Sequence, residues 1–150
     1  GYVGSHACKA LAGAGYLPVT YDSLAMGHEW AVRWGPLEIG DIRDEARLGE
    51  VMRRHRPEAV LHFAASAYVG ESVDHPAEYY SNNVAGSLSL LGMMRREHVS
   101  RIVFSSTCAV YGAPETMPIS ERTPTDPINP YGATKLMGEN ILRDLAGGAR

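Results

Sequence analysis

The side chains best suited to chemistry are a hydroxyl cluster and a tyrosine–lysine pair. Ser105, Ser106 and Thr107 follow a short apolar run, and Tyr131 and Lys135 begin 24 residues after Thr107. Tyr131 and Lys135 are four residues apart in a stretch with helical periodicity, so we expect them on one helix face. Tyrosine is a weak base at neutral pH, but a neighbouring ammonium and a nicotinamide cation both favour the phenolate. Tyr131 could then exchange a proton with a substrate hydroxyl while hydride moves at the adjacent carbon, with Thr107 hydrogen-bonded to the same oxygen. Taken alone, a Tyr-x-x-x-Lys pair is a loose pattern that also occurs on ordinary surfaces.

The first residues and a later aspartate could bind a dinucleotide. Gly1, Tyr2, Val3 and Gly4 lead into a predicted helix, where glycines let the backbone approach a pyrophosphate at the helix N-terminus. Asp22 ends the next predicted strand, 18 residues after Gly4. A carboxylate there accepts hydrogen bonds from ribose hydroxyls and repels a 2′-phosphate, which favours NAD over NADP. Without a ligand, the glycines would be part of an ordinary turn into a helix, and Asp22 would be an ordinary turn residue.

Two further strand ends could contact the same ligand. Asp41 follows a predicted strand at 37–39 and could reach an adenine amino group or cap a turn. Phe63, Ala64 and Ala65 end another apolar run, and small side chains there permit either a flat ligand or close packing.

The elements that must position these residues alternate between strands and helices. This alternation predicts βαβ units, a parallel sheet and ligand sites at the strand carboxyl ends. The fold class is therefore α/β, with a Rossmann-type doubly wound parallel sheet. A stretch with five prolines at 108–130 is predicted to be a functional loop region. The predicted helices are 4–14, 45–55 with Asp44 as its cap, 76–97 and 131–146, and the predicted strands are 17–21, 37–39, 59–63 and 101–105.

Composition limits the class of protein. The 150 residues carry a net charge of −3, which gives no electrostatic case for nucleic acid, and are enough for about one domain. No apolar run approaches the roughly 20 residues of a membrane span. The two cysteines lie 100 residues apart, and no histidine has zinc-ligand spacing to either of them. We expect free thiols, a cytoplasmic protein, no structural metal and no membrane partner.

With these residues in place, the whole chain resembles the extended short-chain dehydrogenase/reductase family. Within that family it is most similar to the branch that inverts C4 of UDP-sugars. The resemblance rests on eight segments in this order: Gly-Tyr-Val-Gly-Ser-His at 1–6, Tyr-Asp-Ser-Leu at 21–24, Gly-Asp-Ile-Arg at 40–43, Leu-His-Phe-Ala-Ala at 61–65, Val-Gly-Glu-Ser-Val at 69–73, Tyr-Tyr-Ser-Asn-Asn-Val at 79–84, Phe-Ser-Ser-Thr-Cys-Ala-Val-Tyr-Gly at 104–112 and Pro-Tyr-Gly-Ala-Thr-Lys-Leu-Met-Gly-Glu at 130–139.

The resemblance implies a full set of site residues. The catalytic residues are Tyr131 as base, Lys135 as its partner and Thr107, and both Thr107 and Tyr131 contact substrate. The implied contacts with NAD are Gly1, Tyr2, Val3, Gly4, Asp22, Ser23, Leu24, Asp41, Ile42, Phe63, Ala64, Ala65, Asn82, Tyr131 and Lys135.

The implied activity is NAD-dependent interconversion of UDP-glucose and UDP-galactose through a 4-keto sugar, in a homodimer. A 4-epimerase of UDP-xylose/arabinose or of N-acetylated UDP-sugars stays open. A nucleotide-sugar 4,6-dehydratase is disfavoured, because it carries Asp-Glu after the threonine where this chain has Cys108 and Ala109. A nucleotide sensor without turnover is also disfavoured, because it would need no proton relay.

The chain departs from the family pattern at three places. It opens at Gly1, without the first strand and the Thr-Gly-Gly-Ala-type turn, and it has no substrate domain after Arg150. Some members carry a lysine where Ala67 stands. We therefore expect a partial NAD-binding domain, truncated at both ends, that is inactive and poorly stable on its own, with an unpaired sheet edge.

Overall fold

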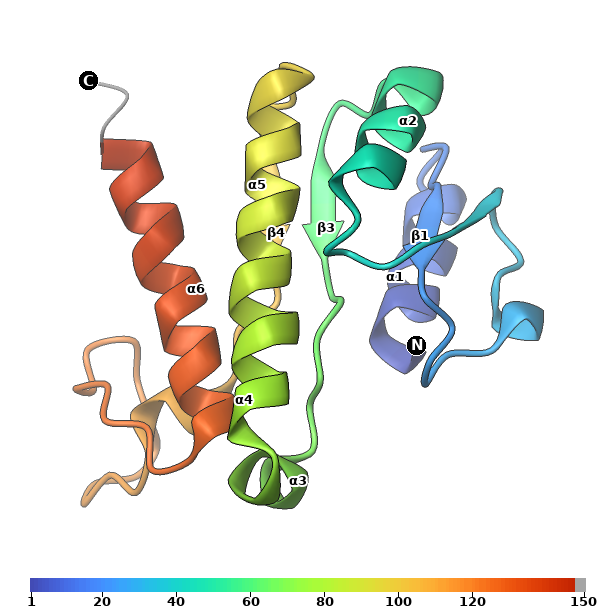
Figure 1. The fold of residues 1–150 in the computed structure, drawn as a ribbon. Coiled ribbons are helices and arrows are strands. Elements are labelled where there is room, and N and C mark those ends of the chain that lie inside the picture. Colours follow the sequence, from blue (N-terminus) through green and yellow to red (C-terminus); the bar gives the residue numbers. More distant parts are fainter. Residues whose placement is uncertain (148–150) are drawn as a thin grey trace. The chain divides into compact units, whose positions relative to one another are not determined.

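The chain alternates helices and strands, as the sequence predicts (Figure 1). The structure is a computed structural model, and it describes residues 1–147. The strands are β1 (Thr20–Asp22), β2 (Leu37–Ile39), β3 (Val60–His62) and β4 (Ile102–Phe104). The α-helices are α1 (Tyr2–Gly13), α2 (Glu45–His55), α3 (Val69–Asp74), α4 (Pro76–Tyr79), α5 (Gly86–Arg96) and α6 (Pro130–Gly147). Three shorter elements complete the set: the 3-10 turns η1 (Glu29–Ala31) and η3 (Cys108–Tyr111) and the π-helical segment η2 (Tyr80–Ala85).

The four strands pair as two sheets of two strands. β1 and β2 run parallel, with Thr20 opposite Leu37 and Asp22 opposite Ile39, and β3 pairs with β4. Parallel pairing agrees with the predicted α/β class. Within residues 1–147 the strands form these two separate pairs, as expected of a doubly wound sheet without its first, central strand.

The chain divides into two compact units. The first unit contains residues 1–64 and 89–103, and the second contains residues 65–88 and those from 104 onward. The boundary crosses α5, whose last eight residues belong to the first unit.

The core of the first unit lies between α2 and its part of α5. The carboxylate of Asp44 caps α2 by accepting a hydrogen bond from the Arg47 amide at 3.0 Å, as expected for an aspartate at that position. The apolar face of α2 is then buried against α5, with Val60 and Ile102 of β3 and β4 packed against the cluster. The buried members are Ile42, Leu48, Met52, Leu90, Met93, Met94 and Val99.

A buried carboxylate ties β2 to α2. Glu38 accepts hydrogen bonds from Arg47 at 2.5 Å, Arg54 at 3.0 Å and His55 at 2.7 Å. These partners, the hydrogen bond from His55 first among them, lower the pKa of Glu38 to about 2. The ion cluster thereby fixes the end of β2, from which the Asp41 turn leads away.

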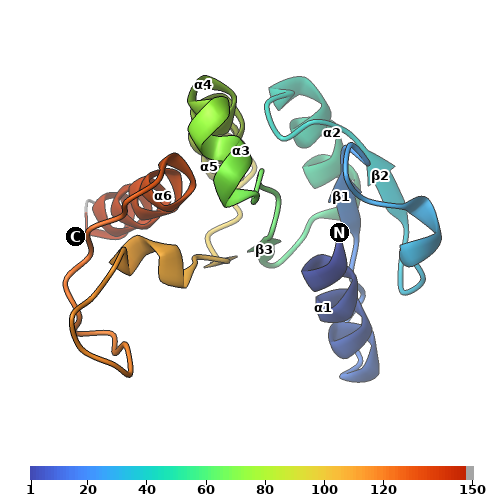
Figure 2. The same cartoon turned by 90° about the horizontal axis from the view of Figure 1, so that it is seen from below.

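The second unit gathers α6, α3, α4 and the short elements η2 and η3; Figure 2 shows α6 beside α3 and α4. The predicted helix over 76–97 is confirmed: helix runs without a break from Pro76 to Arg96 as α4, η2 and α5, with a wider π turn over Tyr80–Ala85. The short helix α3 was not predicted from the sequence. Tyr79 explains why these short pieces hold together. Its buried hydroxyl oxygen accepts from the Tyr68 amide at 3.0 Å and lies 2.7 Å from the Tyr68 carbonyl oxygen and 2.6 Å from the Glu71 carboxylate, which share its single hydrogen. Within residues 1–147, no helix is long and apolar enough to cross a membrane.

Candidate active site

The predicted site residues divide between the two units, so each group is described within its own unit. Those from Gly1 to Ala64 lie in the first unit, and Ala65, Asn82, Thr107, Tyr131 and Lys135 lie in the second.

In the first unit, the aspartate proposed for ribose lies beside the N-terminus of α1. Oδ2 of Asp22 is 3.2 Å from the terminal nitrogen of Gly1, and Oδ1 accepts from the Leu24 amide at 2.8 Å. The side chain of Asp22 is 26% exposed, so a ligand can still reach it. The first amides of a helix have no partner within the helix, and α1 has no side-chain cap. This end of the first unit therefore offers amide donors and a carboxylate acceptor side by side, as a dinucleotide requires.

The Asp41 turn lies next to Asp22. The Gly40 amide donates to the Asp22 carbonyl at 3.2 Å, and the Tyr21 hydroxyl donates to the Asp41 carbonyl at 2.8 Å. Glycine at position 40 leaves room for the Tyr21 ring, because a Cβ there would lie 2.3 Å from the Tyr21 hydroxyl and the ring would have to move. The carboxylate of Asp41 is held by Arg43, at 2.9 Å to Nε and 2.6 Å to Nη2, which lowers the pKa of Asp41 to about 2.

Other predicted contacts in the first unit have less direct support. The side chain of Ile42 belongs to the core cluster and is not free to contact a ligand. Ser23 and Leu24 follow Asp22, and the Ser23 hydroxyl accepts from the Ala25 amide at 3.4 Å. The first turn of α1 lies against Phe63, since a Cβ on Gly4 would be 3.8 Å from that ring. A Cβ on Gly1 would meet nothing within 4 Å, so the structure shows no steric need for glycine at that position.

In the second unit, Lys135 is a buried cation at the end of β4. It is 4% exposed, its Nζ donates to the Ser105 carbonyl at 2.8 Å, and it lies 4.9 Å from the centre of the Phe104 ring. Burial lowers the pKa of Lys135 from 10.5 to about 8. Gly138, one turn further along α6, makes room for this ring, because a Cβ there would lie 2.6 Å from Cζ of Phe104.

Tyr131 and Thr107 lie on elements that pack tightly against each other. Thr107 caps η3 by accepting from the Ala109 amide at 3.2 Å, and Tyr131 is in the first turn of α6. A Cβ on Gly132 would lie 2.6 Å from the Ala109 carbonyl oxygen and 3.0 Å from Cβ of Pro127. The absence of a side chain at Gly132 thus sets how closely the Tyr131 turn approaches η3.

Asn82 belongs to a polar cluster that the sequence did not predict. Its Nδ2 donates to the Ser66 hydroxyl at 3.3 Å and to Oδ1 of Asn83 at 3.1 Å. Asn83 is buried and also bonds to Thr134 of α6 at 3.1 Å. The only signals in the sequence were the paired asparagines and a threonine between Tyr131 and Lys135, and neither reveals a contact across 51 residues.

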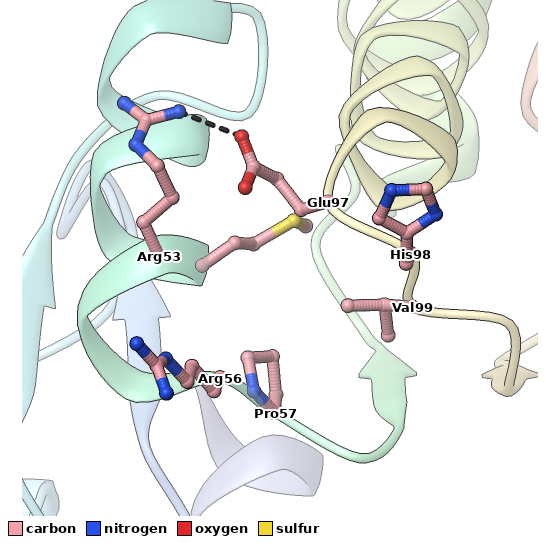
Figure 3. Close-up of a pocket in the computed structure, with 7 residues that line it drawn as sticks. Arg53, Arg56, Pro57, Glu97, His98 and Val99 are labelled. Atoms are coloured by element: carbon pink, nitrogen blue, oxygen red, sulfur yellow. Dashed lines mark hydrogen bonds and ion pairs between the residues drawn. The ribbon is translucent and has the colours of Figure 1, made fainter.

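A pocket in the first unit lies away from the candidate cofactor-binding residues of that unit (Figure 3). It is lined by Met52, Arg53, Arg56, Pro57, Glu97, His98 and Val99. The Arg53 guanidinium is already paired with Glu97 at 2.6 Å. The pocket lies where the chain leaves α2 and α5 to enter β3 and β4, at the amino ends of these strands, whereas α/β proteins bind ligands at the carboxyl ends.

Comparison with known proteins identifies the family of the chain. The sequence profile of the NAD dependent epimerase/dehydratase family matches residues 1–149. The chain belongs to this family. NAD is the cofactor in the family's name, so the predicted family and cofactor are confirmed at that level.

Relatives within the family are similar along almost the whole chain. UDP-glucose 4-epimerase from Rhizobium meliloti (strain 1021) is 55% identical over 144 residues, which are 96% of this chain and 44% of that protein. The solved structure of UDP-glucose 4-epimerase from Brucella ovis in complex with NAD is 56% identical, with a TM-score of 0.94 over 96% of this chain and 44% of that one. The epimerase from Stenotrophomonas maltophila, solved with NAD and formylated UDP-arabinopyranose, is 40% identical with a TM-score of 0.96, over 100% of this chain and 47% of that one.

These similarities confirm the Rossmann-type α/β fold. The chain spans less than half the length of these relatives.

Proposed function

We propose that these residues form the NAD-binding part of a UDP-sugar 4-epimerase that interconverts UDP-glucose and UDP-galactose. The observation that carries the proposal comes from the second unit. There Tyr131 and Lys135 share α6, the Lys135 ammonium donates to the Ser105 carbonyl after β4, and Thr107 caps η3, which packs against α6. The high identity to proteins named for this activity supports the same substrate.

The first unit would hold the adenosine end of NAD. Asp22 would accept from the ribose hydroxyls, Asp41 would accept from the adenine amino group, and the amides at the start of α1 would bind the pyrophosphate. In the second unit, Asn82 and Lys135 would contact the nicotinamide end. NAD, when bound, would supply the acceptor and later the donor of hydride at sugar C4.

The protein's own residues would move the proton. The Tyr131 phenolate takes the proton of the sugar 4-hydroxyl and returns it after the 4-keto sugar has turned in the site. The Lys135 ammonium stabilises the phenolate, and the Thr107 hydroxyl hydrogen-bonds to the sugar oxygen and fixes its direction. Cys108 and Ala109 begin η3 directly after Thr107, so the elimination step of a dehydratase would have no carboxyl group there.

A second candidate keeps the reaction and changes the sugar. The Stenotrophomonas maltophila epimerase was solved with a UDP-arabinopyranose derivative, so the UDP-xylose/arabinose pair is the alternative. The homodimer stays a prediction.

The test uses the full-length protein that carries these residues. UDP-galactose is added without cofactor, and the sugar anomeric signals are followed by NMR. We expect UDP-glucose to appear, and Tyr131→Phe to lower the rate by about 10² or more while the protein keeps its NAD. An NAD-containing wild-type protein that leaves UDP-galactose unchanged but converts UDP-xylose would establish the second candidate.

A further inference from the structure

The buried threonine between Tyr131 and Lys135 makes two hydrogen bonds with different roles. Thr134 is 1% exposed. Its hydroxyl donates to the Tyr131 carbonyl at 2.7 Å, as threonines in helices often do. The same oxygen accepts from Nδ2 of Asn83 at 3.1 Å, a bond to a different element. Valine has nearly the same shape as threonine and would fill this space equally well. Packing alone therefore does not explain why a hydroxyl group is present at position 134.

The amide of Asn83 is fully used by its surroundings. Oδ1 accepts from the Ser66 amide at 2.8 Å and from Nδ2 of Asn82 at 3.1 Å. Nδ2 donates to the Ser66 carbonyl at 3.0 Å and to Thr134. An asparagine side chain has two donor hydrogens and an acceptor oxygen with two lone pairs, so all four positions are filled. This pattern determines the orientation of the amide and leaves it no other partner.

The bonds form a continuous path through the second unit. It runs from the Ser66 backbone through Asn83 to the Thr134 hydroxyl and on to the Tyr131 carbonyl. Asn82, the proposed cofactor contact, is the neighbour of Asn83 in η2, whose π-helical turn is a form found often at functional sites.

We propose that Thr134 is a positioning residue, which holds the Tyr131–Lys135 turn of α6 in register with η2 through its hydrogen bond to Asn83. This inference rests on the proposed function, because it assigns Thr134 a part in the proton transfer that Tyr131 performs. Without the hydroxyl, one Nδ2 hydrogen of Asn83 loses its acceptor, the start of α6 loses its hydrogen bond to η2, and Tyr131 no longer meets the substrate hydroxyl in one geometry. Small displacements of this kind lower kcat even when the ligand still binds.

The test compares two variants that differ by one hydroxyl group, Thr134→Ser and Thr134→Ala, in the full-length protein, with Thr134→Val as the isosteric variant. Assays with UDP-galactose are run well below the unfolding temperature of each variant. We expect Thr134→Ser to stay within about threefold of wild-type kcat, and Thr134→Ala and Thr134→Val to lose about tenfold or more with NAD content and KM little changed.

A second readout is independent of turnover. Hydrogen exchange at the Ser66 amide reports the orientation of Asn83, so its protection should fall in Thr134→Ala and be kept in Thr134→Ser. Equal kcat and equal Ser66 protection in these two variants would overturn the inference. If the wild-type protein does not turn over UDP-sugars, the proposed function fails, whereas equal Ser66 protection in the two variants would show that the Asn83–Thr134 bond positions nothing.

Discussion

Lys135, the proposed partner of Tyr131, is buried at a cost in stability. Its ammonium is enclosed by α6 and the end of β4, with the Ser105 carbonyl as acceptor and the Phe104 ring beside it. Burial holds its pKa at about 8 instead of 10.5, which corresponds to roughly 3 kcal/mol against the charged form. The unfolded chain keeps its proton up to pH 10.5, whereas the folded chain releases it above about pH 8. The destabilisation is therefore complete below pH 8 and diminishes as the pH rises from 8 to 10.5.

Removal of this charge should stabilise the fold. In the full-length protein stripped of NAD, we expect Lys135→Met to raise the free energy of unfolding at pH 7 by about 1–2 kcal/mol. The relief of the roughly 3 kcal/mol burial cost exceeds the about 1.5 kcal/mol lost with the charged hydrogen bond to Ser105. Urea unfolding at pH 7 and pH 9 measures it, and the gain should be smaller at pH 9. Lys9→Met, at the chain's other lysine, is exposed and is the matched control, for which no change is expected. A loss of stability, or a gain equal at both pH values, would contradict the burial argument.

At the scale of elements, the contact between α6 and η3 depends on the absence of one side chain. We expect Gly132→Ala to destabilise the protein by about 1–3 kcal/mol and to lower kcat by about tenfold or more, although alanine favours helices. The new Cβ would meet the backbone oxygen of Ala109, which cannot rotate away, so α6 must move and take Tyr131 with it. Thermal unfolding and turnover of UDP-galactose by the full-length protein measure the two effects.

The control for that change is Gly13→Ala. Gly13 is also helical, at the end of α1, and a Cβ there meets nothing within 4 Å. It should keep or slightly gain stability and leave kcat unchanged. An equal effect of the two substitutions would mean that the α6–η3 contact is not what Gly132 serves.

The elements that the sequence predicts well are those with local signals. Asp44 marks the start of α2 through its cap, and the ends of β2 are predicted to the residue. β1 starts at Thr20 rather than at Leu17, because Pro18 has no amide hydrogen for a ladder and the pairing begins with the Thr20 amide on the Pro36 carbonyl. The π-helical form of η2 and the short helix α3 were missed because a π turn and a helix of six residues depend on tertiary contacts such as the buried Tyr79 hydroxyl.

The site residues also divide into those with local sequence signals and those that depend on distant contacts. Tyr131, Lys135 and Asp22 could be proposed as site residues from the sequence, because residue type and spacing indicate the chemistry they could perform. Thr134, Asn83 and Gly132 could not, because each acts through a partner far away in sequence or through the close approach of another backbone. The chemistry is thus local in the sequence, whereas the positioning of its groups is a property of the fold.

One face of the β3–β4 sheet is exposed in these 150 residues, although the other face packs against the core. Val60 and Ile102 pack against the core of the first unit, so their neighbours Leu61 and Val103 point to the opposite face. Val103 is 60% exposed, which is unusual for a valine in a strand. We expect this face to be covered in the full-length protein and open in the 150-residue chain expressed alone.

Val103→Thr distinguishes the two states, because it changes polarity at nearly constant shape. In the isolated chain we expect it to cost little stability and to reduce binding of an apolar dye, since the side chain already meets water. In the full-length protein it should cost about 1–3 kcal/mol, because the hydroxyl group would be buried without a partner. Urea unfolding of both lengths, each with and without the substitution, gives the comparison.

The wild-type isolated chain should also unfold over a broader range and at a lower temperature than the full-length protein, since sheets of two strands are marginal alone. An equal cost of Val103→Thr in both lengths would show that the face stays open in the full-length protein.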